Sequence, residues 1–243
     1  MRRRAEPWNL PMHMKADDLQ RYLARARERF GDRLLTWLTL LLVVLTFVIV
    51  PLHAAGLIVT QGYVFAIVLV MASCIVGAPA GVGAVIAMLF GVALAVAAVV
   101  ARLMDHPRPG MVLDAAAWVT VGAALAYVVA RAVFAPGRVT YHRITGAVLL
   151  YLTIGQIFVG LYGMVDLVVP HSLSGVSVAE APKLLSDLIY FSFSMLTTVG
   201  YGDIVPVHPI ARSLSSVEAI IGQLYPATLL ARLVTLELED RRR

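Results

Sequence analysis

The run Ser194–Pro206, SMLTTVGYGDIVP, places threonines, glycines and an aspartate between long apolar stretches of the chain. Gly200 and Gly202 flank Tyr201, and glycine is unfavourable in the interior of a helix and in the centre of a strand. Irregular backbone at membrane depth is tolerated only where it is buried in protein or lines an aqueous path. The run therefore predicts a non-helical segment inside a membrane protein, held by the helices around it.

The composition of the whole chain agrees with a membrane protein. Of its 243 residues, 60% are hydrophobic and only 14% are charged, whereas about a quarter of the residues in soluble domains are charged. The sequence has no phosphate-binding loop, no metal-ligand cluster and no nucleophile–base pair, so we expect a protein that is not an enzyme and that needs no cofactor.

Six apolar runs approach the length of about 20 residues that a helix needs to cross a bilayer. We therefore expect an all-α integral membrane protein with six transmembrane helices. The predicted spans are Leu34–Leu52, Leu57–Val76, Gly81–Ala101, Met111–Phe134, Ile144–Val169 and Ile210–Leu238.

The distribution of charge divides the chain into three predicted parts. Residues 1–33 are rich in arginine, and their apolar residues recur at helical spacing, which favours a basic amphipathic helix on anionic membrane lipid rather than a nucleic-acid site. A solvated helix that only orients the first span is the alternative. Residues 34–135 hold the first four predicted spans, and residues 136–243 hold the last two spans with the run Ser194–Pro206 between them. The positive-inside rule predicts that both termini are cytoplasmic.

The segment before the opening run predicts a second, shorter kind of helix. Ala181–Thr198 has helical character, and Pro182 suits the first turn of a helix. This helix is too short to cross a bilayer. A short helix followed by an extended, glycine-rich segment predicts a re-entrant loop.

The motif TVGYG at Thr198–Gly202, within the longer match TTVGYGDIVP, is the signature of a potassium-selective filter. Residues Ile144–Leu238 resemble the tetrameric potassium channels in the order outer helix, pore helix, filter and inner helix. The resemblance implies a homotetramer that conducts K⁺ passively, since each chain supplies one loop. It also implies that the carbonyls of Thr198, Val199, Gly200 and Tyr201, with the Thr198 hydroxyl, replace the hydration shell of K⁺. The last span resembles that of small bacterial channels, which implies the bacterial inner membrane.

Residues near the filter are expected to support it. Glycine at 200 and 202 relieves the alternating backbone conformations that inward-facing carbonyls require. Tyr201 is expected to pack on the pore helix beside Tyr190 and Phe191. Asp203 is expected at the outer mouth, where it accepts hydrogen bonds or simply forms a turn.

Ser194 and Glu218 are two further residues that we expect to support the filter. Ser194 stands where some bacterial relatives carry a glutamate that pairs with the filter aspartate, so filter properties of those relatives do not transfer directly. Glu218 is an ionisable group inside an apolar span, and such groups are costly and usually functional. We expect the Glu218 side chain to support the filter from behind by a hydrogen bond to Ser192, Ser194 or Thr197. A direct role in ion binding is the alternative.

The last span also contains a candidate gate. Pro226 cannot donate a hydrogen bond to the carbonyl of Gly222, so the pair predicts a kink or hinge, unless it serves static packing. Leu230, Val234 and Leu238 recur at four-residue spacing, which suits a hydrophobic constriction or ordinary helix packing.

The first four spans lack the arginine repeat that voltage-gated relatives carry. Only Arg131 lies within Met111–Phe134, so arginine-based voltage gating is not expected. Two other functions fit the same pattern: a nonconducting accessory or lipid-binding scaffold, and a component of a K⁺ transporter. Transporters with related loops usually hold four divergent loops in one chain, which argues against the second.

Overall fold

The computed structural model describes residues 35–57, 82–104, 107–134, 141–176 and 181–241. The first described residues, from Leu35 on, are helical and lead into a π-helical stretch that precedes a proline, Pro51. The elements are η1 (Leu45–Ile49), α2 (Val50–Ala54), α4 (Val82–Leu103), α5 (Pro107–Val133), α6 (Tyr141–Val168), β1 (Leu173–Ser174), α7 (Ala181–Leu196), β2 (Val205–Pro206) and α8 (Pro209–Arg241).

Within these described ranges, four helices are long and apolar enough to cross a membrane: Leu35–Ala54, Gly83–Ala101, Pro109–Val133 and Ile144–Val168. They correspond to the first, third, fourth and fifth predicted spans. The second predicted span and the basic segment 1–33 lie almost wholly outside the described residues.

The sixth predicted span forms α8, a helix of 33 residues, which is not among these four. Its length suffices, but serines, Glu218 and Gln223 along its first half reduce its apolar character. A helix with polar residues at membrane depth needs protein or water beside it rather than lipid alone.

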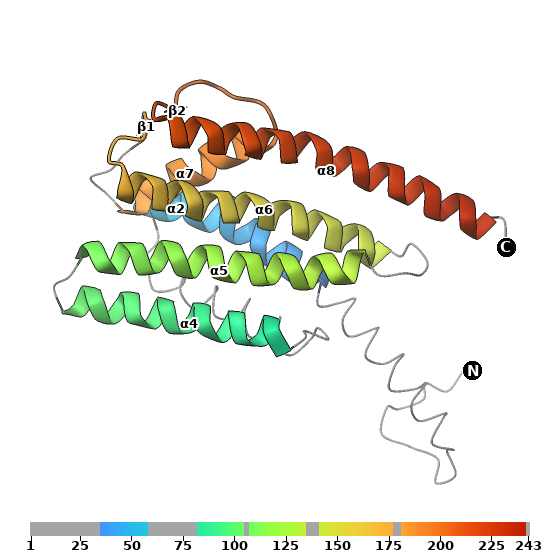
Figure 1. Ribbon diagram of the computed structural model, residues 1–243, viewed down its shortest axis with the longest axis horizontal. Coiled ribbons are helices and arrows are strands. Elements are labelled where there is room, and N and C mark those ends of the chain that lie inside the picture. Colours follow the sequence, from blue (N-terminus) through green and yellow to red (C-terminus); the bar gives the residue numbers. More distant parts are fainter. Residues whose placement is uncertain (1–34, 58–81, 105–106, 135–140, 177–180, 242–243) are drawn as a thin grey trace, which may run out of the picture.

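The long helices lie side by side, and α7 is the exception (Figure 1). Helix α5 packs against both α4 and α6, and α6 packs against α8. Helix α7 contacts α2, α6 and α8. The strands β1 and β2 lie at one end of the molecule, and α8 projects beyond the other helices at the opposite end (Figure 1).

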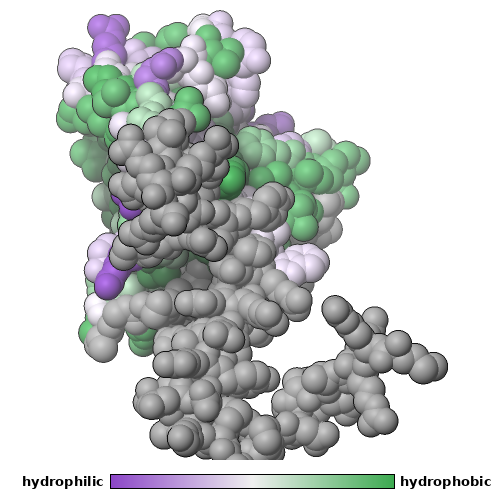
Figure 2. Space-filling model, turned by 90° about the vertical axis from the view of Figure 1, so that its right-hand side faces the viewer, coloured by the Kyte–Doolittle hydropathy of each residue, from purple (hydrophilic) through white to green (hydrophobic). Residues whose placement is uncertain are grey.

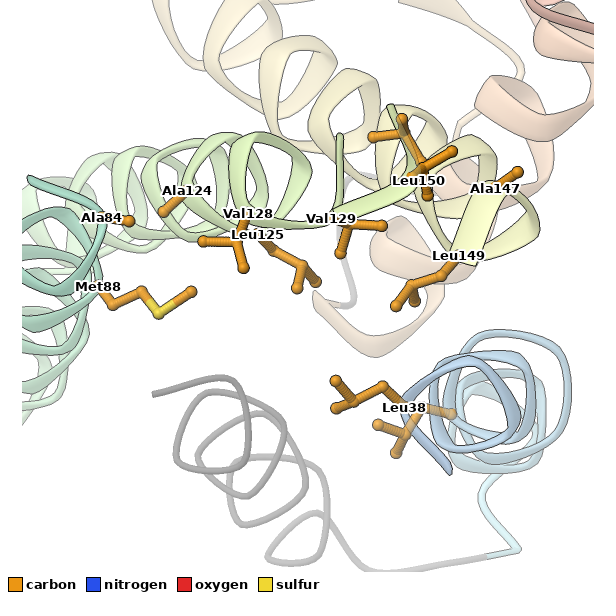
Figure 3. Packing of buried hydrophobic residues seen from close by; sticks show 12 residues of the cluster. Leu38, Ala84, Met88, Ala124, Leu125, Val128, Val129, Ala147, Leu149 and Leu150 are labelled. Atoms are coloured by element: carbon orange, nitrogen blue, oxygen red, sulfur yellow. The ribbon is translucent and has the colours of Figure 1, made fainter. Parts of the chain in front are cut away.

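One core joins the first helix to α4, α5 and α6. Met88 of α4 points toward Leu125 and Val128 of α5, and Leu149 of α6 points toward Leu38 of the first helix (Figure 3). Buried side chains on both sides of residue 135 therefore share this core. Glycines let the helices approach: a Cβ at Gly91 would lie 2.6 Å from Val121 Cγ2, and one at Gly122 would lie 2.7 Å from Ile157 Cγ1.

Polar side chains link the same helices inside the apolar region. The Gln156 amide of α6 donates a hydrogen bond to the Thr46 hydroxyl of η1 at 2.7 Å. The Trp118 indole of α5 donates to the Gln156 carbonyl at 2.7 Å. Interhelical hydrogen bonds of this kind help helices associate where lipid removes the hydrophobic driving force.

Much of the described outer surface is apolar (Figure 2). Large side chains such as Trp37, Ile86, Phe90 and Leu103 are exposed. A soluble monomer seldom exposes so much apolar area, so this surface agrees with a membrane protein.

Candidate functional site

The C-terminal end of α7 is closed by a defined cap. The Val199 N–H donates to the Ser194 carbonyl at 2.9 Å, and the Thr198 N–H donates to the Met195 carbonyl at 2.9 Å. These two bonds form a Schellman motif, in which the residue after the helix takes a left-handed conformation and is usually glycine. Here that residue is Thr198, with φ of 61°. Helix α7 therefore ends at Leu196, two residues before the predicted end, because Thr197 and Thr198 form the cap.

The segment Thr198–Gly202, which the sequence predicts as a filter and which is hereafter called the filter segment, alternates in backbone conformation. The φ angles of Thr198, Gly200 and Gly202 are 61°, 56° and 81°, whereas those of Val199 and Tyr201 are not positive. The sequence predicted the two glycines at such positions. It did not predict the threonine, whose branched Cβ makes a positive φ cost about 1–2 kcal/mol.

Ser194 bonds the filter segment directly. Its hydroxyl oxygen accepts a hydrogen bond from the Gly200 N–H at 3.1 Å, and its carbonyl lies 3.3 Å from the same nitrogen. The side chain is buried. Ser194 thus fixes the backbone at the middle of the filter segment.

Tyr201 packs on α7 through one of its two predicted neighbours. The rings of Tyr190 and Tyr201 stack with centroids 5.7 Å apart. The ring of Phe191 instead packs edge-to-face on the ring of Tyr162 in α6, with centroids 4.9 Å apart. Adjacent positions on a helix point about 100° apart, so Tyr190 and Phe191 face different elements, and within the single chain only Tyr190 is found against Tyr201.

Asp203 lies exposed directly after the filter segment. Its carboxylate accepts hydrogen bonds from the Ile204 N–H at 3.0 Å and from the Tyr190 hydroxyl. Tyr190 therefore holds both Tyr201, by stacking, and Asp203, by its hydroxyl.

A small antiparallel sheet anchors the chain after the filter segment. Leu173 and Ser174 of β1 pair with Pro206 and Val205 of β2. A Cβ at Gly175 would lie 2.3 Å from the Asp203 carbonyl oxygen, and the φ of Gly175 is 90°. Only glycine fits this position, which the sequence alone did not reveal.

The last carbonyl of α7, that of Leu196, is held from two other helices. The Tyr151 hydroxyl of α6 donates to it at 3.0 Å. A Cβ at Gly222 of α8 would lie 1.8 Å from the same oxygen. Gly222 therefore lets the backbones of α7 and α8 meet, a packing role at the position predicted as a hinge.

Two threonines at the end of α7 have different partners. The Thr198 hydroxyl accepts a hydrogen bond from the Gln223 amide at 3.0 Å. The Thr197 hydroxyl donates back to the Phe193 carbonyl of its own helix at 2.6 Å. Thr197 therefore bonds the end of α7, whereas Thr198 links the filter segment to α8.

Glu218 is fully buried behind α7. Its Oε1 lies 2.6 Å from the Ser192 hydroxyl oxygen, and its Oε2 lies 2.7 Å from that of Tyr162. The Ser192 hydroxyl also lies 2.9 Å from the Gly155 carbonyl oxygen. Of the three partners predicted for Glu218, the structure places Ser192 against it and adds Tyr162, whose sequence distance gave no signal.

The gate residues are placed only in part. Helix α8 continues through Gly222 and Pro226 without interruption. Leu230 is exposed in the single chain. The side chains of Val234 and Leu238 lie outside the described residues, so the constriction stays a prediction.

Comparison with known proteins adds to this geometry. Residues 146–238 match an ion channel family. The matched stretch contains α7, the filter segment and nearly all of α8. The match supports an ion channel in a membrane and gives no indication of an enzyme.

Three relatives show local similarity. Protein LctB of Bacillus caldotenax is 35% identical over 88 residues, covering 35% of this chain and 64% of that protein. Protein LctB of Geobacillus stearothermophilus is 41% identical over 52 residues, covering 21% and 38%. The inward rectifier potassium channel Kirbac3.1 of Paramagnetospirillum magnetotacticum is 37% identical over 43 residues, covering 18% and 15%. The chain thus spans less than two thirds of each relative, and no solved structure matches it.

Proposed function

We propose that this protein is a K⁺-selective channel in which four copies of the chain meet around one axis. Each copy contributes one filter segment, and K⁺ passes between the four segments down its gradient. The carbonyl oxygens of Thr198, Val199, Gly200 and Tyr201, with the Thr198 hydroxyl, take the place of water around the ion.

The observation that carries this proposal is the alternating backbone of the filter segment directly after the capped end of α7. Alternation in the sign of φ brings successive carbonyls toward the same side of an extended chain. The C-terminal end of a helix bears a partial negative charge, which favours a cation nearby. Backbone and helix end thus both suit a partly dehydrated cation.

Exposure of the same region in the single chain supports assembly with further copies. Val199 is 55% exposed and Tyr201 is 71% exposed. On α8, Val217, Ile220 and Leu224 are exposed at the three- and four-residue spacing of one helix face. We propose that neighbouring copies cover these side chains. The proposed channel lies in a bacterial inner membrane with both termini cytoplasmic and has no arginine-based voltage gating.

The test is ion flux from liposomes that contain the purified protein. We expect rapid loss of a K⁺ gradient and retention of a Na⁺ gradient. Gly200→Ala should abolish this discrimination or the flux, because alanine disfavours a φ of 56°. A Cβ there meets nothing closer than Met195 Cε at 3.6 Å, so the effect would come from the backbone and not from a clash.

Gly56→Ala is the matched control. Gly56 has a φ of 76° and nothing within 4 Å of its Cβ position, but it lies outside the filter segment. It should keep selective flux at a similar cost in backbone strain. Unchanged selectivity in Gly200→Ala, or no flux from the wild-type protein at any voltage and pH, would contradict the proposal.

A further inference from the structure

The hydrogen bonds around the buried carboxyl group of Glu218 need more protons than the neighbouring hydroxyls supply. Three short contacts join four groups: Tyr162 to Oε2, Ser192 to Oε1, and Ser192 to the Gly155 carbonyl. Each contact needs one proton between its two oxygens. The Tyr162 and Ser192 hydroxyls supply two protons, and the Gly155 carbonyl supplies none. The third proton has to come from the carboxyl group itself.

The charges around Glu218 also indicate that its carboxyl group is protonated. From α6, Tyr162 and Tyr151 face Glu218, and from α7 Ser192 faces it. Among the described residues no cationic group acts on this carboxyl. A carboxylate that is shielded from solvent and has no cation beside it is costly to bury, whereas a neutral acid that is fully hydrogen-bonded is much less so.

We infer that Glu218 carries a proton in the folded protein and acts as a positioning residue for the filter. Its Oε1–H donates to Ser192, whose hydroxyl donates on to the Gly155 carbonyl, while Tyr162 donates to Oε2. This chain of hydrogen bonds runs from α8 through α7 to α6.

The chain of hydrogen bonds fixes the distance between the helix that carries the filter segment and the helix that lines the pore. Ser192 lies two residues before Ser194, which holds the Gly200 N–H at 3.1 Å. On the other side, Gly222 lies one helical turn after Glu218 and touches the Leu196 carbonyl. The effect on conduction rests on the proposed function; the protonation does not.

Infrared spectroscopy of the full-length protein tests the protonation directly. The difference spectrum between wild type and Glu218→Gln should show the carbonyl band of a neutral carboxylic acid at neutral pH. Tyr162→Phe should shift that band to higher frequency, because its carbonyl oxygen loses a donor. Asp166→Asn, which removes a half-buried carboxyl at the end of α6, should leave the band intact. Absence of the band in the wild type would overturn the inference.

Thermal unfolding gives a second readout that needs no flux. A group that is protonated when folded and ionised when unfolded takes up a proton on folding, so its contribution to stability falls as the pH rises. As the pH rises from about 4.3, the ordinary pKa of a glutamate, to neutral, the wild type should lose stability more steeply than Glu218→Gln. Equal slopes for the two proteins would contradict the inference.

Flux in liposomes tests the positioning role. In Glu218→Gln the new side-chain amide would reproduce the neutral pattern, with its N–H donating to Ser192 and its carbonyl accepting from Tyr162, so this variant should keep selective K⁺ flux. Glu218→Ala leaves both hydroxyls without this partner and should reduce flux by roughly tenfold or more. Equal impairment of the two variants would overturn the positioning role of the neutral acid. If the wild type conducts nothing, the proposed function fails and the infrared band still decides the protonation.

Discussion

Gly222 of α8 lies in direct backbone contact with Leu196, the last residue of α7. A Cβ added at Gly222 would lie 1.8 Å from the Leu196 carbonyl oxygen and 2.7 Å from the carbonyl carbon. Because the atoms in the way belong to the backbone, no side-chain rotation can relieve the overlap. The helix that leads to the filter segment and the last helix therefore cannot move apart or together without changing this contact.

Gly222→Ala should destabilise the protein and disturb the filter. Overpacking in a core costs about 1–3 kcal/mol, and the strain would fall on the end of α7. We expect a lower unfolding temperature and reduced K⁺ selectivity in liposomes. Gly83→Ala is the matched control, because Gly83 lies within α4 with nothing within 4 Å of its Cβ position. A Gly222→Ala variant as stable and selective as Gly83→Ala would contradict the packing role.

Ser194→Ala should weaken the filter segment with little effect on the fold. The change removes the hydroxyl that accepts from the Gly200 N–H and leaves only the carbonyl at 3.3 Å. Loss of one buried hydrogen bond costs about 1 kcal/mol. The discrimination between K⁺ and Na⁺ flux should fall while the unfolding temperature changes little.

Ser216→Ala provides the comparison for that variant. Ser216 is exposed on α8 and donates to the Arg212 carbonyl of its own helix. Its replacement should leave selectivity unchanged. If the two serine variants discriminate equally well, Ser194 does not support the filter.

The sequence allowed prediction of those features that depend on local pattern. Apolar length located four of the spans, and Pro182 with the apolar run after it located α7. The glycines at 200 and 202 indicated positive φ angles because few other residues adopt them. Features that depend on contacts between distant segments were not predictable. The Tyr151 hydroxyl reaches Leu196 across 45 positions in the sequence, and Tyr162 reaches Glu218 across 56.

Two positions show why local pattern is insufficient. Gly222 was predicted as a hinge or a static kink because Pro226 follows one turn later, and nothing in the sequence indicated that the facing backbone of α7 leaves no room for a Cβ there. Thr198 takes a conformation that its branched side chain disfavours, because the Schellman cap requires a left-handed residue there. In both cases the end of α7 explains the feature: it leaves room only for glycine at 222 and requires a left-handed residue at 198.

Tyr151→Phe should affect the end of α7 specifically. It removes the donor to the Leu196 carbonyl but keeps the aromatic ring, whose centroid lies 5.6 Å from that of Tyr225. An orphaned buried carbonyl costs about 1–3 kcal/mol, so unfolding should occur at a lower temperature and selective flux should decrease. Tyr127→Phe, at an exposed tyrosine of α5, should change neither measurement. An unaffected Tyr151→Phe variant would show that the Leu196 carbonyl needs no such donor.

Arg232→Gln should change how the first helices influence the pore. The Arg232 guanidinium donates to the Phe134 carbonyl at 2.7 Å and lies 5.0 Å from the centre of the Phe134 ring. This contact joins the C-terminal half of α8 to the end of α5, where a cation also meets the negative end of the helix dipole. Because the contact is exposed, its loss should leave the unfolding temperature nearly unchanged. The fraction of time that single channels stay open in planar bilayers should change severalfold. Arg131→Gln is the control and should behave as wild type. Arg131 is a nearby arginine of α5 whose guanidinium donates to the Tyr127 hydroxyl of its own helix at 3.5 Å. Identical open fractions in the two arginine variants would show that α5 does not act on the pore through Arg232.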